Sequence, residues 1–191
     1  CVGFMIPGAG GNLENGQERL VKTPWFDYEV PFTKAAEFGT RKVIRDHSTI
    51  GILVTADGSF GEIPRDSYVE AEKKTVAELN EIVKPFMVLV NSERQYSKAT
   101  QALTEKLSKE YNTSVMAVNC DQLRQEDILE ILKNVLLEFP LSSVGFYLPK
   151  WVETLRDDHW MKKSVLDLVK EFMTDKNKMK DLYQKVFPSN D

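Results

Sequence analysis

Cysteine and histidine are scarce in this sequence, with two residues of each among 191. The cysteines, Cys1 and Cys120, are too few for a disulfide framework, and their separation matches no metal-site spacing. The histidines, His47 and His159, are not accompanied by the signature of a catalytic triad, so we expect them to be structural or solvent-facing. The low cysteine content makes a reducing, cytoplasmic setting the default expectation.

Long apolar runs and an excess of positive charge are also missing. No apolar segment approaches the roughly 20 residues that a membrane-spanning helix needs, and no segment has the form of a secretory signal. The formal net charge is -4, from 25 basic and 29 acidic side chains. These features argue against a transmembrane segment and against a nucleic-acid partner, which normally contacts a basic patch.

What the sequence does contain is the composition of a folded domain, with 42% hydrophobic and 28% charged residues. Residues 1–31 are rich in glycine and proline and are predicted to be loop-like. The chain opens at Cys1, directly in this glycine-rich stretch. We therefore expect it to be a fragment of a longer protein.

Residues 32–140 alternate between apolar runs and amphipathic helical patterns. The apolar runs predict strands at roughly 49–55, 86–90 and 114–119. The helical patterns predict helices over 32–47, 66–82, 97–110 and 125–138, with Asp66 and Ser97 as N-caps of the second and third. Buried strands alternating with helices predict an α/β fold, a mostly parallel sheet with helices on both faces.

Residues 141–191 have a different pattern, which predicts a linker strand over 142–151 and a C-terminal extension made of one long helix from about 158 onward. The helix carries an apolar stripe, interrupted at Asp175, that consists of Met161, Val165, Leu168, Phe172, Met179, Leu182 and Val186. The stripe either packs on the body of its own molecule, the interpretation we favour, or serves as a coiled-coil or assembly contact.

The predicted strands also indicate where a ligand would bind. In an open parallel sheet, ligands bind at the carboxyl ends of the strands. Four loops have such a position: the glycine-rich stretch after Gly3, and the loops at 55–59, 91–94 and 118–123. Each loop alone is explained equally well by a turn or a strand cap. Their convergence on one edge of a sheet predicts a site.

Four long segments carry a family resemblance. They are "CVGFMIPGAGG", "ENGQERLVKTPWFDYEVPFTKAAEFGTRKVIRDHSTIGILVTADGSFGEIPRDSYVEAE", "KPFMVLVNSER" and "LPKWVETLRDDHW". They resemble the stage IV sporulation protein A family of spore-coat morphogenetic ATPases, and the resemblance covers essentially the whole chain. It implies a translation-factor-like P-loop NTPase with a GTPase-like layout. Residues 1–140 would be the C-terminal part of that domain, and 141–191 would lead to a following domain.

The resemblance implies that ATP and Mg²⁺ are the cofactors of the intact protein. Cys1-Val2-Gly3 would be the end of an Asp-x-x-Gly motif whose Mg²⁺-binding Asp lies just upstream, with the Walker A loop further upstream. Because phosphoryl transfer depends on those parts, we expect the 191-residue chain alone to be inactive. We also expect it to fold partly or to be adhesive, because a sheet without its first strands exposes an edge.

The base-reading loop of a GTPase has the form Asn-Lys-x-Asp, and its Asp accepts hydrogen bonds from guanine. The segment "NSER" keeps Asn91 but has Ser92 in place of the Lys and Arg94 in place of the Asp. Arginine has only donors, so it would leave the guanine donors unpaired, a mismatch that can cost several powers of ten in selectivity. Asn119 and Cys120 stand where GTPases carry Ser-Ala-Lys. Both departures fit the use of ATP by the family.

The residues predicted to bind the nucleotide are Gly3, Asn91, Ser92, Arg94, Asn119 and Cys120. No catalytic residue and no metal ligand is predicted among the 191 residues. Asn91 is also expected to brace the loops around the base.

For the intact protein, the resemblance implies an ATP hydrolase that polymerises to form the base of the spore coat. It would act in the cytoplasm, on the mother-cell side of the forespore outer membrane. Its partners would be further copies of itself, other spore coat proteins and a small membrane-associated anchoring protein. The alternative is a structural, partner-binding scaffold with a degenerate nucleotide site, and a GTPase switch is a third hypothesis. An intact Walker A loop upstream would favour the first.

Overall fold

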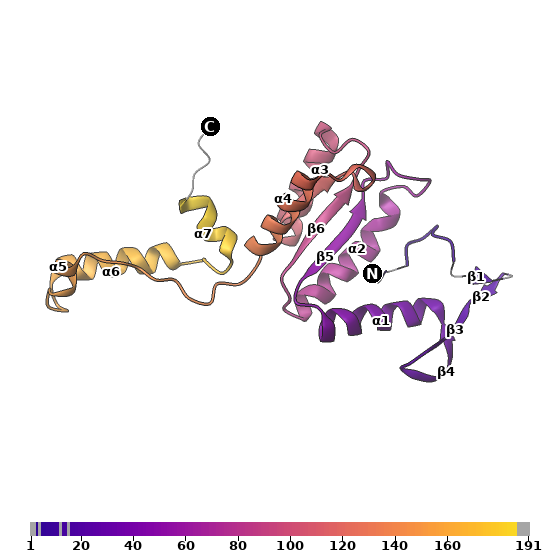
Figure 1. Ribbon diagram of the computed structural model, residues 1–191, viewed down its shortest axis with the longest axis horizontal. Coiled ribbons are helices and arrows are strands. Elements are labelled where there is room, and N and C mark those ends of the chain that lie inside the picture. The colour runs from indigo at the N-terminus through magenta and orange to yellow at the C-terminus, as the bar shows by residue number, and fades with distance from the viewer. Residues whose placement is uncertain (1–2, 4, 12, 15, 187–191) are drawn as a thin grey trace. The chain divides into compact units, whose positions relative to one another are not determined.

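The computed structural model describes residues 3, 5–11, 13–14 and 16–186 (Figure 1). The chain divides into two compact units, Cys1–Val135 (unit 1) and Leu136–Asp191 (unit 2). None of the helices within the described ranges combines the length and the hydrophobicity that crossing a bilayer requires.

The N-terminal region of unit 1 contains four short strands where the sequence predicts loops. β1 (Leu13–Glu14) pairs with β2 (Gln17–Glu18), and β3 (Leu20–Thr23) pairs with β4 (Phe26–Pro31), both antiparallel. The second hairpin is anchored by aromatic rings: Phe38 of the following helix lies 5.6 Å from Trp25 between ring centroids. The loop prediction is wrong here because strands this short show no periodicity, and a tertiary contact stabilises the hairpin.

The central sheet of unit 1 is parallel, as predicted. Its strands are β5 (Gly51–Ala56), β6 (Phe86–Asn91) and β7 (Val115–Val118), in the order β5-β6-β7. The register places Ala56 opposite Asn91, and Asn91 opposite Val118. The carboxyl ends of all three strands therefore lie at the same level of one sheet edge.

Four α-helices accompany the sheet: α1 (Phe32–His47), α2 (Asp66–Glu81), α3 (Lys98–Tyr111) and α4 (Gln125–Leu137). The main core joins buried side chains of α2 and α3 to one face of β6, and it consists of Val76, Leu79, Phe86, Val88, Val90, Leu107 and Tyr111. Figure 1 shows α4 on the other side of the sheet from α2. The fold is thus α/β with helices flanking a parallel sheet, as the sequence predicts.

Of the two predicted N-caps in this unit, one is confirmed. The Ser97 hydroxyl accepts the backbone N–H of Thr100 at 3.1 Å and caps α3. Asp66 is not a cap, because the chain already has helical dihedral angles at Arg65 and Asp66 is the first residue of α2. An acidic residue in the first turn still complements the helix dipole.

Unit 2 departs further from the prediction. It has no strand at 142–151, where the described chain contains only the first residues of the short helix α5 (Lys150–Glu153). The predicted single long helix is wrong as well, because two helices are found, α6 (Trp160–Met173) and α7 (Met179–Val186). The break lies at Asp175, whose φ of 64° is left-handed and cannot continue an α-helix.

The break in unit 2 coincides with a tertiary clasp. The backbone N–H of Met179 donates to the carbonyl of Phe139 at 3.0 Å, and Pro140 forms an isolated bridge with Lys178. The buried carboxylate of Glu138 accepts hydrogen bonds from Lys178 and Lys180 at 2.6 and 2.9 Å. A continuous helix would not allow α7 to turn back to Glu138, so the predicted apolar stripe is divided between two helices.

Candidate functional site

The loops after β5, β6 and β7 begin side by side at the carboxyl edge of the sheet. The N–H of Asp57 donates to the carbonyl of Asn91 at 3.2 Å, and the N–H of Ser92 donates to the carbonyl of Val118 at 2.9 Å. These bonds continue the pairing of β5 with β6, and of β6 with β7, just beyond the ends of β5 and β6. Three of the four predicted loops therefore converge, as the topology requires.

Asn91 ties two of these loops together. Its side-chain oxygen accepts the backbone N–H of Cys120 at 3.0 Å, across a sequence separation of 29 residues. A second tie runs between the same loops, because the Gln95 side-chain oxygen accepts the N–H of Asn119 at 2.7 Å. The Asn119 side chain accepts the N–H of Asp121 at 3.1 Å and so shapes its own loop. Both asparagines act as braces, and their contact with a nucleotide stays a prediction.

Ser92 lies underneath the loop that follows β6, here called the base loop (residues 91–97). Its exposed fraction is 0%, and its hydroxyl accepts the N–H of Arg94 at 3.0 Å. The same hydroxyl lies 3.3 Å from the Thr100 hydroxyl. The structure therefore gives Ser92 a supporting role inside the protein, whereas the sequence places it among the residues that touch a ligand.

Arg94 and Cys120 are exposed, unlike Ser92. The base loop makes a tight turn between Arg94 and the start of α3, because the N–H of Ser97 donates to the Arg94 carbonyl at 2.8 Å. Burial and the neighbouring Asp121 raise the pKa of the Cys120 thiol, so the thiol is neutral near pH 7. The loop thus presents a guanidinium on a fixed backbone.

Asp57 begins the loop after β5 and is ionised at neutral pH. Burial alone would raise the pKa of its carboxyl, but the hydrogen bonds from Ser59 and Thr100, together with the nearby Ser92 hydroxyl, outweigh burial and hold that pKa below its ordinary value. Ser59 contributes both its N–H, at 2.9 Å, and its hydroxyl, at 2.5 Å. A carboxylate held in this way is a fixed negative charge at the sheet edge.

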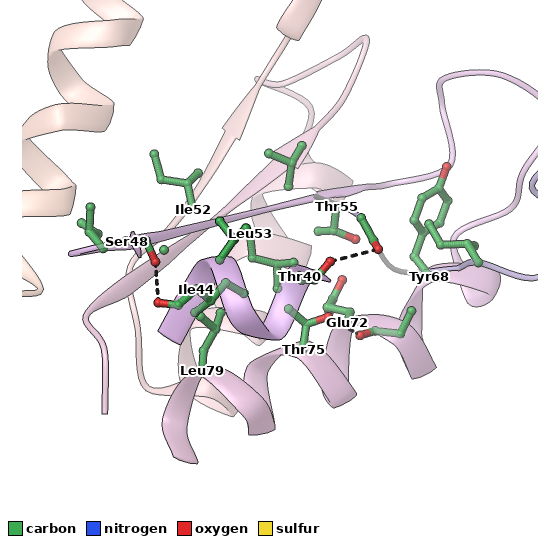
Figure 2. A pocket seen from close by; sticks show the side chains of 17 residues that line it. Thr40, Ile44, Ser48, Ile52, Leu53, Thr55, Tyr68, Glu72, Thr75 and Leu79 are labelled. Atoms are coloured by element: carbon green, nitrogen blue, oxygen red, sulfur yellow. Dashed lines mark hydrogen bonds between the residues drawn. The ribbon is translucent and has the colours of Figure 1, made fainter. Parts of the chain in front are cut away.

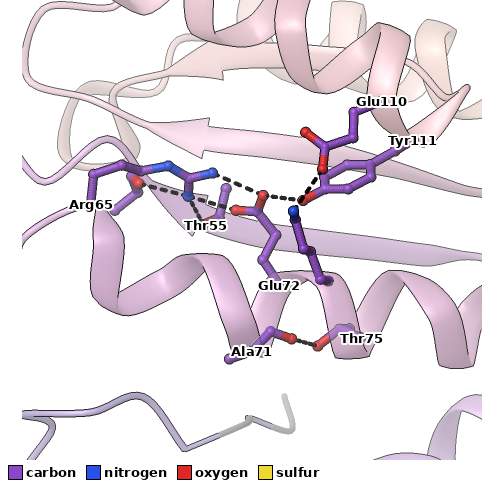
Figure 3. A network of polar contacts seen from close by, with 9 residues as sticks. Thr55, Arg65, Ala71, Glu72, Thr75, Glu110 and Tyr111 are labelled. Carbon is purple, nitrogen blue, oxygen red and sulfur yellow. Dashed lines mark hydrogen bonds and ion pairs between the residues drawn. The ribbon is translucent and has the colours of Figure 1, made fainter.

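The end of β5 is anchored from below by a buried ionic network (Figure 3). Arg65 donates to the Thr55 hydroxyl at 3.0 Å and to the Ala56 carbonyl at 3.3 Å. It also pairs with Glu72 at 2.6 Å, and Glu72 accepts the Tyr111 hydroxyl at 2.6 Å. Burial would raise the pKa of Glu72, but these partners lower it overall, so Glu72 is ionised. The pKa of Tyr111 is raised by burial and by Glu72, so its hydroxyl remains a donor.

Gly3 lies apart from the contacts of the base loop. Its carbonyl accepts the Thr40 hydroxyl at 3.3 Å, and it borders a largely apolar cavity of ≈ 540 Å³ (Figure 2). Most of the other residues that line this cavity belong to α1, β5 and α2, and the cavity extends along β5. Cys1 and Val2, the other residues of the predicted motif, lie outside the described residues. Because the cavity has few polar groups, we regard the sheet edge as the better candidate for a nucleotide site.

The residues present fit the adenine base of ATP better than they fit Mg²⁺. Adenine offers ring-nitrogen acceptors, which the guanidinium donors of Arg94 can match. For Mg²⁺, the described part of the chain contains no group of three or more His, Cys, Asp and Glu side chains that could hold a metal ion. The donor set within these residues therefore does not fit a metal site.

Sequence reasoning missed three residues that shape this edge, Ser59, Gln95 and Thr100. A signal exists for Ser59, since Asp-Gly-Ser is a typical turn sequence in which the Asp side chain binds the N–H two residues on, and the structure has this bond. Thr100 lies three residues after Ser97, the position whose backbone N–H an N-cap side chain is expected to bind. The contact of Gln95 with Asn119 has no local signal.

Comparisons with known proteins identify the family of the chain. Residues 1–140 match the family model described as "Stage IV sporulation protein A, ATPase domain", and residues 141–191 match "Stage IV sporulation protein A, middle domain". No solved structure gave a significant match.

Curated relatives lead to the same family. The chain is 42% identical over 182 residues to stage IV sporulation protein A of Bacillus subtilis (strain 168), and 44% identical over 182 residues to that of Clostridioides difficile (strain 630). Each alignment covers 95% of this chain and 37% of the relative. On the strength of both family models and these identities, the chain belongs to the stage IV sporulation protein A family.

Proposed function

We propose that the full-length protein hydrolyses ATP during sporulation and that the base loop contributes to the recognition of adenine. The observation that carries this proposal is the brace from Asn91 to Cys120, at 3.0 Å, which fixes the loops after β6 and β7 while Arg94 remains exposed. The match to a family model described as an ATPase domain supports the reaction class.

The chemistry of Arg94 explains the choice of base. Guanine presents N–H donors where a GTPase supplies a carboxylate, and a guanidinium cannot accept them. Guanine bound against Arg94 would keep these donors unpaired, which costs about 1–3 kcal/mol for each buried group. Adenine lacks the ring N–H and the 2-amino group and avoids this cost. The full-length protein should therefore prefer ATP to GTP.

Parallel turnover assays with ATP and GTP test the proposal. We expect the wild-type full-length protein to prefer ATP, and Arg94→Asp to reduce the ratio of the two kcat/KM values about tenfold, because an acceptor is restored. Arg45→Asp is the matched control, since it makes the same charge change at an exposed position of α1. A wild-type protein that prefers GTP would contradict the proposal.

We also propose a cellular role for the full-length protein. ATP hydrolysis, supported by Mg²⁺, would drive its polymerisation into the base of the spore coat on the mother-cell side of the forespore outer membrane. Its partners would be further copies of itself, other coat proteins and a small membrane-associated anchoring protein. Sedimentation of the full-length protein with and without ATP tests the polymerisation step, and polymer that forms equally well without nucleotide would contradict it.

A scaffold that does not depend on nucleotide is the second candidate. It is favoured by the exposed apolar residues of β5, where Ile52 and Val54 are 46% and 56% exposed. Such residues on a sheet are typical of a surface that packs against another element. Assembly that persists in a variant unable to bind ATP would favour this candidate over the first.

A further inference from the structure

Asp57 lies at the centre of a hydrogen-bond network that reaches the base loop. Its carboxylate accepts the Ser59 hydroxyl at 2.5 Å and the Thr100 hydroxyl at 3.3 Å. An ionised carboxylate only accepts hydrogen bonds, so both hydroxyl protons point toward Asp57. The oxygen lone pairs of Ser59 and Thr100 can then accept other donors, and the Ser97 hydroxyl lies 2.8 Å from the Thr100 oxygen as one of them.

Those lone pairs serve the base loop. The Ser59 oxygen accepts the backbone N–H of Glu93 at 2.9 Å. The Thr100 oxygen lies 3.3 Å from the Ser92 hydroxyl, which in turn accepts the N–H of Arg94 at 3.0 Å. Two consecutive backbone N–H groups are therefore linked to one carboxylate, one through a single hydroxyl and the other through two.

The network has a defined direction. Because the hydroxyl protons of Ser59 and Thr100 point to Asp57, the Ser59 oxygen accepts from the backbone of Glu93 and the Thr100 oxygen can accept the Ser92 hydroxyl. The Ser92 oxygen then accepts the N–H of Arg94. The partners come from the loop after β5, from the base loop and from the first turns of α3, so the connection depends on the whole sheet edge. Both N–H groups belong to the segment that presents Arg94.

We infer that Asp57 is a positioning residue for nucleotide recognition, which acts through Ser59 and Thr100 to hold the base loop in its binding conformation. This inference rests on the proposed function. Asp57 does not touch the base in this scheme, and its effect reaches the ligand through the backbone of Glu93 and Arg94. The ligand class is a purine nucleotide, and the step affected is binding.

Asp57→Asn is the first test, in the full-length protein. The new amide places an N–H donor against one of the two hydroxyl donors, so one branch of the network is lost. We expect KM for ATP to rise about tenfold and kcat to change less than about threefold, because the loop acts on binding. Asp46→Asn, which makes the same chemical change on the exposed surface of α1, should leave KM unchanged.

Ser59→Ala is the second test, because it removes the link to Glu93 and keeps Asp57. KM should again rise several-fold, and Ser59→Thr should restore it by returning the hydroxyl. The double variant Asp57→Asn/Ser59→Ala should have a KM for ATP about equal to the higher of the two single-variant values, since both changes cut the same connection. Fully multiplied effects would overturn the shared path.

Hydrogen exchange provides a readout that needs no nucleotide. In Asp57→Asn, amide exchange should become at least about tenfold faster in the peptide that covers the base loop, and remain unchanged in β6. Unchanged exchange in the base loop overturns the inference, as does unchanged KM in both Asp57→Asn and Ser59→Ala. If Asp57→Asn fails to fold, Ser59→Ala decides by the same two measurements. A wild-type protein that does not bind ATP contradicts the proposed function instead, and the exchange experiment still decides the positioning role.

Discussion

Arg65→Met is expected to destabilise unit 1, because it leaves the buried carboxylate of Glu72 with a single strong partner. In the wild-type structure, the Arg65 guanidinium makes two bonds to Glu72, at 2.6 and 2.9 Å. Glu72 is only 3% exposed, so water cannot replace the lost donors. The Tyr111 hydroxyl, at 2.6 Å, would remain. Methionine keeps much of the apolar stem and so isolates the effect of the charge.

The geometry sets the expected magnitude. Removing one partner of a buried ion pair costs about 3–5 kcal/mol, whereas losing one hydrogen bond to a charged group costs about 1.5–3 kcal/mol. Arg65→Met should therefore be more damaging than Tyr111→Phe, which keeps the ion pair. The double variant Arg65→Met/Glu72→Leu removes both charges and should recover most of the loss, because replacing a buried pair by apolar residues is close to neutral.

Native-state hydrogen exchange of the β6 amides in the full-length protein measures this directly, because a local readout avoids the unfolding of other parts. A loss of about 3–5 kcal/mol corresponds to exchange faster by roughly two to three and a half powers of ten. Exchange in Arg65→Met within about threefold of wild type would refute the reasoning. So would a double variant as unstable as the single one, since the unpaired charge would then not be the cause.

Three further outcomes are expected. Gly58→Ala should destabilise unit 1 by at least about 1 kcal/mol, because φ is +87° and a Cβ would lie 2.8 Å from the Arg65 backbone nitrogen; β6 exchange as slow as in wild type would contradict this. The folded-state pKa of Glu72 lies below its ordinary value of 4.5, so its stabilisation is complete above that pH and is lost as pH falls through the folded pKa. Unfolding measured against pH should show this acid loss in wild type and not in Glu72→Gln. Phe172→Ala should loosen α6 by roughly 1–2 kcal/mol, because the edge-to-face contact with Phe146 at 6.1 Å is lost, and unchanged exchange in α6 would count against it.

Much of the central fold was predictable because its signals are local. The first five residues of β6, Phe86–Val90, are all apolar and buried, as expected for a strand covered on both faces, and the helices around it repeat their apolar residues at helical spacing. The convergence of the loops at Asp57, Asn91 and Asn119 followed from topology alone, since parallel strands end at one edge. The donor-only character of Arg94 is a property of the residue type, so the departure from the guanine-reading motif was also visible in the sequence.

Other features depend on contacts that no local pattern encodes. The interruption of the apolar stripe at Asp175 indicated a break in the helix there. The return of the chain to Glu138 before α7 depends on tertiary contacts that the stripe does not show. The hairpin of β3 and β4 exists because an aromatic cluster packs it against α1. Short elements of this kind gain their stability from partners far along the chain.

Within the candidate site, residue types were readable from the sequence, whereas their roles were decided by the tertiary structure. Ser92 occupies a position where a ligand contact was predicted, yet it is fully buried and supports the backbone of Arg94. Glu72 and Tyr111 are 39 residues apart and meet only because α2 and α3 pack on the same face of β6. Periodicity reports which face of an element is apolar, but the donor that reaches a given buried oxygen depends on the path of the folded chain.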